Sequence, residues 1–147
     1  AGEKLTSVPS DIIPFSAWLV RNPDGRTLTT GAPRDPYRGE YYQVARSFNP
    51  DFNEELSPVS ATTSVLGIIM KGQPKAYVKS EIPLGDTFDE VAGERIVISR
   101  TEDDSIRFAA LNETQLLPRT AIPVVEGFWF SWSAAHPDTL LWQPIEP

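Results

Sequence analysis

The sequence predicts a small, mainly β domain of the α+β class. We expect a curled antiparallel sheet or barrel-like meander, with two short tryptophan-anchored helices and long proline-rich loops. Four short apolar or alternating segments follow one another between residues 64 and 111, which is the spacing of an antiparallel meander. Two tryptophan-bearing segments each end at a proline, and the 14 prolines of the chain leave little room for long helices.

The length of 147 residues fits one domain, which we assign to residues 1–147. Residues 1–30 form a helix–turn segment, and residues 31–61 form a long loop rich in aromatic residues and proline. Residues 62–147 hold the β meander and a tryptophan-rich helix–turn. A loop of this length inside a compact domain is typically functional or bound to a partner.

The first predicted helix begins after Ser10, a residue suited to an N-cap, and carries Pro14 in its first turn. Asn22 precedes a proline, which disfavours the helical conformation, so the helix ends there. The extended segment after it covers "RTLTT".

The strands are predicted at residues 64–72 and 75–80, with Gln73 and Pro74 in the turn between them. Residues 94–100 and 105–111 alternate well between apolar and polar, and the acidic stretch "TEDD" between them is typical of a hairpin turn. A second helix is expected at residues 128–135, ending at His136 and Pro137, with residues 139–142 extended.

The two ends of the chain share the pattern W-x3-[N/H]-P-D-x3-[L/W], with an offset of 114 residues. We interpret it as an internal repeat in which a tryptophan anchors a short helix and an aspartate hydrogen-bonds the backbone to set the turn. Because Asn22 stands in the first copy of the pattern where His136 stands in the second, a catalytic role for His136 is disfavoured. The predicted structural turn residues are Trp18, Asn22, Pro23, Asp24, Trp132, His136, Pro137 and Asp138, and Leu28 corresponds to Trp142.

Composition excludes several kinds of site. The formal net charge of −7 disfavours nucleic acids and anionic membrane surfaces as partners. The absence of cysteine removes disulfides, thiolate chemistry and sulfur-ligated metal sites, and with a single histidine a metal ion would have mainly oxygen ligands, which no motif supplies. No apolar run reaches the roughly 20 residues of a membrane-spanning helix. We therefore predict no catalytic residue, no metal and no cofactor.

Aromatic residues are the strongest remaining functional signal. The segment "FWFSW" places aromatic side chains all around its helix, so we expect some of them to face a second surface. The candidate partner contacts are Tyr37, Tyr41, Tyr42, Phe48, Phe52, Phe128 and Trp129.

Four stretches in order resemble domain-of-unknown-function family 3179. These are "KLTSVPSDIIPFSAWLVRNPDGRTL", "RDPYRGEYY", "VLGIIMKGQPKAYVKSEI" and "FWFSWSAAHPDTLLW", so the likeness covers about Lys4 to Trp142. The resemblance implies a two-half plan, many apparently exported relatives and no established activity. The chain departs from the family in three ways: it lacks the cysteine-containing first half, it carries Val78 where proline is usual, and it is shortened between Ile98 and Leu117.

We therefore expect a non-catalytic binding or assembly subunit, an extracytoplasmic (periplasmic or extracellular) accessory component of a larger complex with other protein subunits. One alternative is an oxygen-ligand or carbohydrate-binding protein, or an enzyme, with a site near His136 and Asp138. The other is a self-assembling filament or surface-layer subunit. The first residues fit either a cleaved signal peptide or a trimmed chain.

Overall fold

The computed structural model describes residues 8–27, 52–111 and 120–144. This part of the chain is mainly β, as the sequence predicts, and forms two four-stranded sheets and two helices rather than a closed barrel. The elements in chain order are α1 (Phe15–Arg21), β1 (Ser64–Met70), β2 (Gln73–Val78), the 3-10 helix η1 (Lys79–Glu81), β3 (Gly85–Val91), β4 (Glu94–Arg100), β5 (Ile106–Ala110), β6 (Thr120–Ala121), β7 (Val125–Phe128), α3 (Trp129–Ala135) and β8 (Leu140–Leu141).

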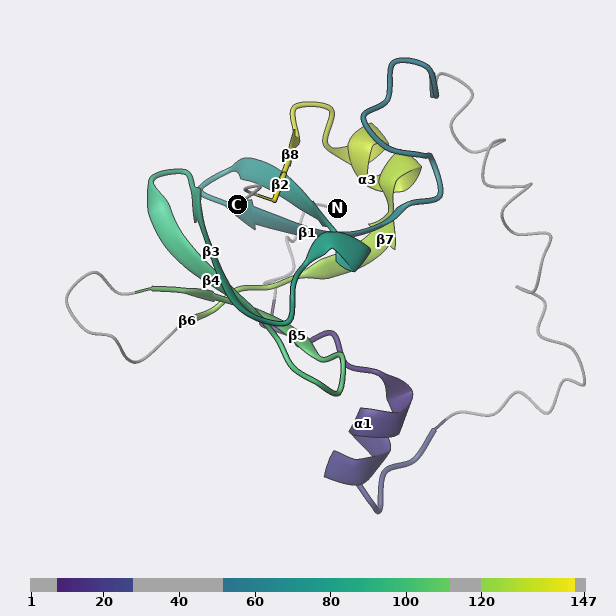
Figure 1. Ribbon diagram of the computed structural model, residues 1–147, viewed down its shortest axis with the longest axis vertical. Helices are drawn as coiled ribbons and strands as arrows, with labels where there is room; N and C mark the ends of the chain where they lie inside the picture. The colour runs from purple at the N-terminus through teal and green to yellow at the C-terminus, as the bar shows by residue number, and fades with distance from the viewer. Residues whose placement is uncertain (1–7, 28–51, 112–119, 145–147) are drawn as a thin grey trace, which may run out of the picture.

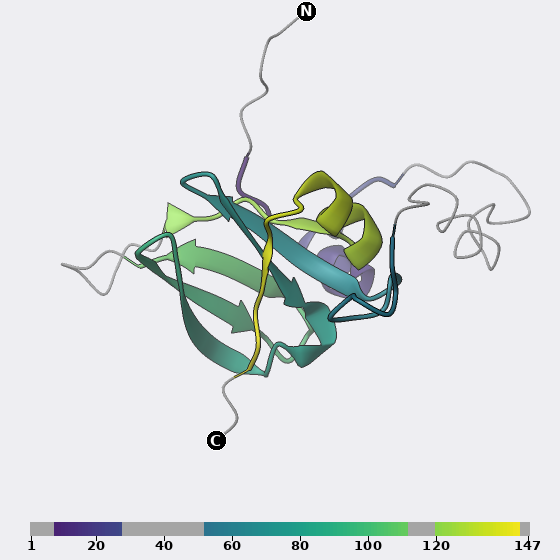
Figure 2. The same ribbon diagram turned by 90° about the horizontal axis from the view of Figure 1, so that it is seen from above.

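The first sheet has the strand order β7-β1-β2-β8 and the second has the order β3-β4-β5-β6. Neighbouring strands are antiparallel, except that β8 runs parallel to β2. The sheets pack face to face (Figures 1 and 2). The chain crosses from the first sheet to the second through η1 and returns to the first sheet in the connection from β6 to β7.

The main core fills the space between the two sheets. Period-2 alternation places every second side chain of β1 and β2 on this inner face, opposite the inner face of β4 and β5. Its fully buried members include Leu66, Ile68, Tyr77, Ile96, Ile98, Ile106 and Phe108, and Trp142 closes it from the C-terminal side. The ring of Tyr77 packs edge-on against Phe108, with the centroids 5.0 Å apart.

Two predicted boundaries in the strand region are wrong. The β1–β2 turn is formed by Lys71 and Gly72, with φ of 49° and 84°, and not by Gln73 and Pro74, which already belong to β2. A two-residue hairpin turn of this type needs positive φ at both positions, which glycine supplies at the second. Predicted strand 75–80 ends at Val78, where η1 begins.

Strand β3 was not predicted, because "GDTFDEV" carries three acidic residues and low β propensity. It pairs with β4 along its whole length through a second turn of the same kind, at Ala92 and Gly93 (φ 53° and 76°).

The first helix begins at Phe15, four residues later than an N-cap at Ser10 requires, and Pro14 takes the N-cap position. The residues before it are held by the second sheet instead. Ile12 exchanges two main-chain hydrogen bonds with Ile106 of β5, at 3.0 and 2.7 Å. The Ser10 hydroxyl donates to the carbonyl oxygen of Val124. Two strand-like bonds therefore replace the first turn of the expected helix.

The helices occupy different positions relative to the sheets. Helix α3 packs on the outer face of β1 and β7, whereas α1 projects from the body beyond β5 (Figure 1). No helix in residues 8–27, 52–111 or 120–144 is long and apolar enough to cross a membrane.

Candidate functional site

The two helix–turn segments, residues 14–25 and 128–139, have the same backbone geometry. Each helix has seven residues, and the C-cap residues Asn22 and His136 have φ/ψ of −132°/70° and −136°/72°. Each C-cap N–H donates to the carbonyl oxygen of the tryptophan four residues before it, Trp18 or Trp132, at 2.9 Å. The helices end at the residues that the sequence predicts.

Each turn is closed by the main chain and not by the aspartate that the sequence predicts for this role. The N–H of Gly25 donates to the carbonyl oxygen of Asn22, and that of Thr139 donates to the carbonyl oxygen of His136, at 2.8 and 3.0 Å. Neither Asp24 nor Asp138 makes a side-chain hydrogen bond with another described residue. The closing bond therefore does not explain why an aspartate follows the proline in both turns.

Helix α3 buries its aromatic side chains. Trp129 and Trp132 are 5% and 7% exposed and pack with Val65, Ala76 and Val78 on the outer face of the first sheet. Their indole N–H groups donate to the Ser57 and Thr139 hydroxyls, each at 2.8 Å. The expectation that Trp129 offers an exposed partner contact is therefore wrong for this structure, because its ring and its N–H are already satisfied within the chain.

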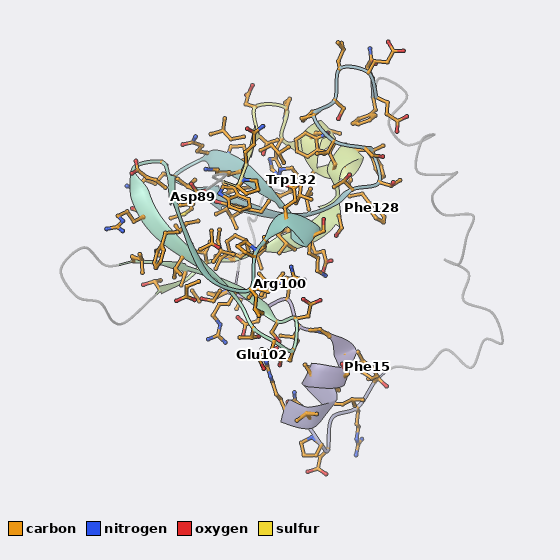
Figure 3. The ribbon with its side chains drawn as sticks, viewed as in Figure 1. Phe15, Asp89, Arg100, Glu102, Phe128 and Trp132 are labelled. Atoms are coloured by element: carbon orange, nitrogen blue, oxygen red, sulfur yellow. The ribbon has the colours of Figure 1, made fainter. Side chains whose placement is uncertain are left out.

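The six-membered ring of Trp132 lies directly on Gly67 of β1. Trp132 is labelled in Figure 3. A Cβ at this glycine would overlap the ring, so the strand must lack a side chain here. The neighbouring candidate Phe128 is half-buried and stacks on Phe130, with the ring centroids 6.2 Å apart. Phe52 is also half-buried. It packs against the buried cluster that contains Trp129 and Trp132 and against the one formed by Ala61 and Phe130.

Helix α1 leaves most of its apolar side chains uncovered. Phe15 and Val20 are 58% and 84% exposed, and Leu19 is exposed as well. Trp18 is half-buried: its ring lies over Gly25 of its own turn and is stacked on Phe15, with the ring centroids 5.9 Å apart. This exposed face of Phe15, Trp18, Leu19 and Val20, which we call the α1 face, is the candidate interaction surface.

Helix α1 is held to the body through its opposite side. The Arg21 guanidinium donates to the Asp103 carboxylate at 2.8 Å and to the Ser105 hydroxyl at 2.9 Å, and Ala17 is buried. Hydrogen bonds from Thr101 and Ser105, with a smaller contribution from Arg21, hold the pKa of Asp103 well below its usual range. Asp103 is therefore ionised at neutral pH and available to orient α1.

The single histidine lies beside a shallow apolar groove. The ring of His136 is against that of Trp132, with a centroid distance of 4.2 Å. The groove has a volume of about 330 Å³, and its walls include Ile69, Val125 and Glu126. The Glu126 carboxylate accepts from the Lys79 ammonium at 2.6 Å, so it is already paired. No hydrogen bond joins His136 to a carboxylate in the described part of the chain, so the orienting partner of a general base is lacking there.

A polar cluster that was not predicted from the sequence lies between the sheets. The Tyr77 hydroxyl donates to the Asp89 carboxylate at 2.7 Å, and the Lys75 ammonium pairs with the same oxygen at 2.6 Å. Lys75 and Asp89 are only 12% and 15% exposed, and together they join β2 of one sheet to β3 of the other. Burial and, to a smaller extent, the hydrogen bond to Asp89 raise the pKa of Tyr77 far above its ordinary value. The sequence signal for this cluster was a charged residue at an inward-facing position of each strand, Lys75 in β2 and Asp89 in β3. It could not be used because β3 was not predicted as a strand.

Four predicted partner contacts, Tyr37, Tyr41, Tyr42 and Phe48, lie outside the described residues, as does Leu28 of the shared pattern. Within residues 8–27, 52–111 and 120–144, no three histidine or acidic side chains gather as metal ligands would. The α1 face was also missed, although the 114-residue offset pairs Phe15 with Trp129 and could have drawn attention to it.

Fold and surface together define a mainly β, two-sheet domain with a pair of matching helix–turn segments, one covered by a sheet and one uncovered. Residues 1–139 match the model of the family described as "Protein of unknown function (DUF3179)", and the chain belongs to that family. Neither a curated protein nor a solved structure matches the chain.

Proposed function

We propose that this protein is a non-catalytic assembly subunit that binds another polypeptide through the α1 face. One observation carries the proposal: the two helices share their length, their C-cap dihedral angles and their closing turn, but α3 buries all three of its aromatic side chains. Helix α1 instead exposes Phe15 and leaves Trp18 half-buried. Exposed apolar patches of this kind are typical of interfaces. We take the two segments as an internal repeat, whose shared geometry supports a common docking role.

Arg21 and Asp103 support the proposal because they fix the direction in which the α1 face points. A surface that is already oriented loses less conformational entropy when it binds. The resemblance to exported proteins supports a location outside the cytoplasm as part of the same proposal.

A matched pair of double variants tests the proposed function in cells that express the protein natively. Phe15→Ser with Leu19→Ser removes the centre of the α1 face, whereas Leu84→Ser with Phe88→Ser removes two apolar side chains that are exposed elsewhere. We expect both variants to fold, and only the α1 variant to lose the larger native complex in size-exclusion chromatography. A complex that survives the α1 variant, or that either variant disrupts equally, contradicts the proposal.

The groove beside His136 favours a second candidate, carbohydrate binding, because the exposed Ile69 and Val125 and the ring of Trp132 offer apolar walls. Titration with soluble oligosaccharides should then quench indole emission, and Val125→Asp should abolish the quenching. Unchanged emission across a panel of oligosaccharides would remove this candidate.

A further inference from the structure

The kind of partner can be inferred from how the two helices use their faces, and this inference rests on the proposed function. In α1, Ala17 is buried and Arg21 bonds the body, whereas the corresponding positions of α3, Ser131 and Ala135, are exposed. Conversely, Phe15 is exposed and the corresponding Trp129 is buried. Helix α1 therefore contacts its own chain through the side that α3 leaves free, and leaves free the side that α3 docks.

The surface under α3 shows what such a helix face fits. It consists of the outer side of β1, β2 and β7, where Val65, Ala76 and Val78 are buried and Gly67 receives the ring of Trp132. The next glycine on this side, Gly127 of β7, pairs with Val65. Gly67 lets the indole ring approach the backbone of β1 closely, whereas a Cβ at Gly127 would meet no atom within 4 Å.

We propose that the α1 face docks on an antiparallel β-sheet of another polypeptide whose outer face repeats this design, with a glycine opposite Trp18. The α3–sheet interface is the template for the contact, because the two helices share their C-cap dihedral angles and carry Trp18 and Trp132 at corresponding positions. The sheet of a second copy is not the partner, because its Gly67 is already covered by its own Trp132. In the free protein Trp18 folds back on Gly25, and docking turns its ring toward the partner's glycine.

A graft within the full chain tests whether the α1 sequence fits a sheet of this design. Trp132, Pro137 and Asp138 already match α1, so seven substitutions convert α3 to the α1 sequence: Trp129→Phe, Phe130→Ser, Ser131→Ala, Ser133→Leu, Ala134→Val, Ala135→Arg and His136→Asn. A second graft keeps Phe130, whose burial against Ala61 has no counterpart in α1.

We expect at least the second graft to fold, to show a cooperative transition on denaturation, and to keep the blue-shifted emission of a buried Trp132. Adding Gly67→Ala to it should lower the unfolding midpoint by as much as the same substitution does in the parent protein. The inference is overturned if neither graft folds, or if the folded graft does not respond to Gly67→Ala.

A photo-crosslinking amino acid at position 15 separates this inference from the proposed function. Crosslinks mapped by mass spectrometry to strand residues next to a glycine of the partner support the sheet. Crosslinks to a helix or a loop of the partner overturn the inference and leave the assembly role standing. If position 15 forms no crosslink and the complex also survives the α1 double variant, the proposed function fails as well.

Discussion

A phenol at the centre of the core illustrates how single residues join the two sheets. Tyr77 is fully buried, packs on Phe108 and Trp142, and donates its hydroxyl proton to Asp89. Asp89 is also paired with Lys75, so its charge is compensated although it is largely buried. A buried polar group that is fully satisfied specifies one arrangement of the sheets.

Tyr77 should make the stability of the protein fall at alkaline pH. Its pKa is raised in the folded state, so above the ordinary tyrosine value of about 10 the unfolded chain releases a proton that the native state keeps. The stabilisation is complete below pH 10, and we expect it to decrease by up to about 1.4 kcal/mol per pH unit above it.

Urea denaturation of the wild type and of Tyr77→Phe between pH 8 and 11.5 measures this effect. The variant should be less stable by about 2 kcal/mol at pH 8, because it lacks a hydrogen bond to a charged group. The difference between the two proteins should shrink as the pH rises. Parallel pH profiles would mean that Tyr77 is not the group responsible.

His136→Asn should leave the fold nearly unchanged. Asn22 occupies the corresponding C-cap with the same dihedral angles, and its side-chain amide donates to the Trp18 carbonyl oxygen at 3.0 Å. The substituted asparagine can make the same bond to Trp132, which offsets the lost ring contact. We expect a change in unfolding free energy within about 1 kcal/mol, measured by thermal or urea denaturation. A loss of more than about twice that amount would show that the imidazole has a role of its own.

At the scale of elements, the sequence predicted those segments whose own pattern decides their structure. Strands β4 and β5 alternate cleanly, and both helices end where a residue precedes proline. Strand β3 and the start of α1 were missed, because pairing with another strand decides them. Main-chain bonds to β4 outweigh the low propensity of β3, and the bonds between Ile12 and Ile106 outweigh an N-cap at Ser10.

Gly67→Ala should loosen α3. The new methyl group overlaps the ring of Trp132, and the cost of overpacking is about 1–3 kcal/mol. Gly127→Ala is the matched control on the neighbouring strand, since a Cβ there meets no atom within 4 Å. Denaturation with indole emission as the probe should show a destabilised and red-shifted Gly67→Ala protein and a nearly normal control. Equal effects of the two substitutions would mean that the ring can move aside without cost.

At the scale of the whole molecule, stability is distributed unevenly. The two sheets and α3 share buried apolar contacts, whereas α1 is attached mainly by Arg21 and by the residues before it. An ion pair as exposed as Arg21–Asp103 orients the helix but contributes little to the free energy of unfolding. The chain therefore combines a packed body with one helix that is oriented but not covered.

Amide hydrogen exchange should reveal this difference. The N–H groups of Trp18 and Asn22 should exchange at least about 100-fold faster than those in the centre of β1 and β4, because α1 opens without unfolding the body. Protection of α1 that matches that of α3 in the isolated protein would show that its face is covered within the chain. Protection gained only in the native complex agrees with the proposed assembly role.

The sequence by itself determined the fold class, the family, the helix ends and the two matching turns, because these depend on local pattern and on proline chemistry. It did not determine which of the two helices is covered. Both segments carry tryptophan and apolar neighbours, and the more aromatic one was expected to face a partner. Only the tertiary structure decided the matter, because Gly67 and the small residues around it form a surface for Trp132, while no described sheet offers the same surface to Trp18.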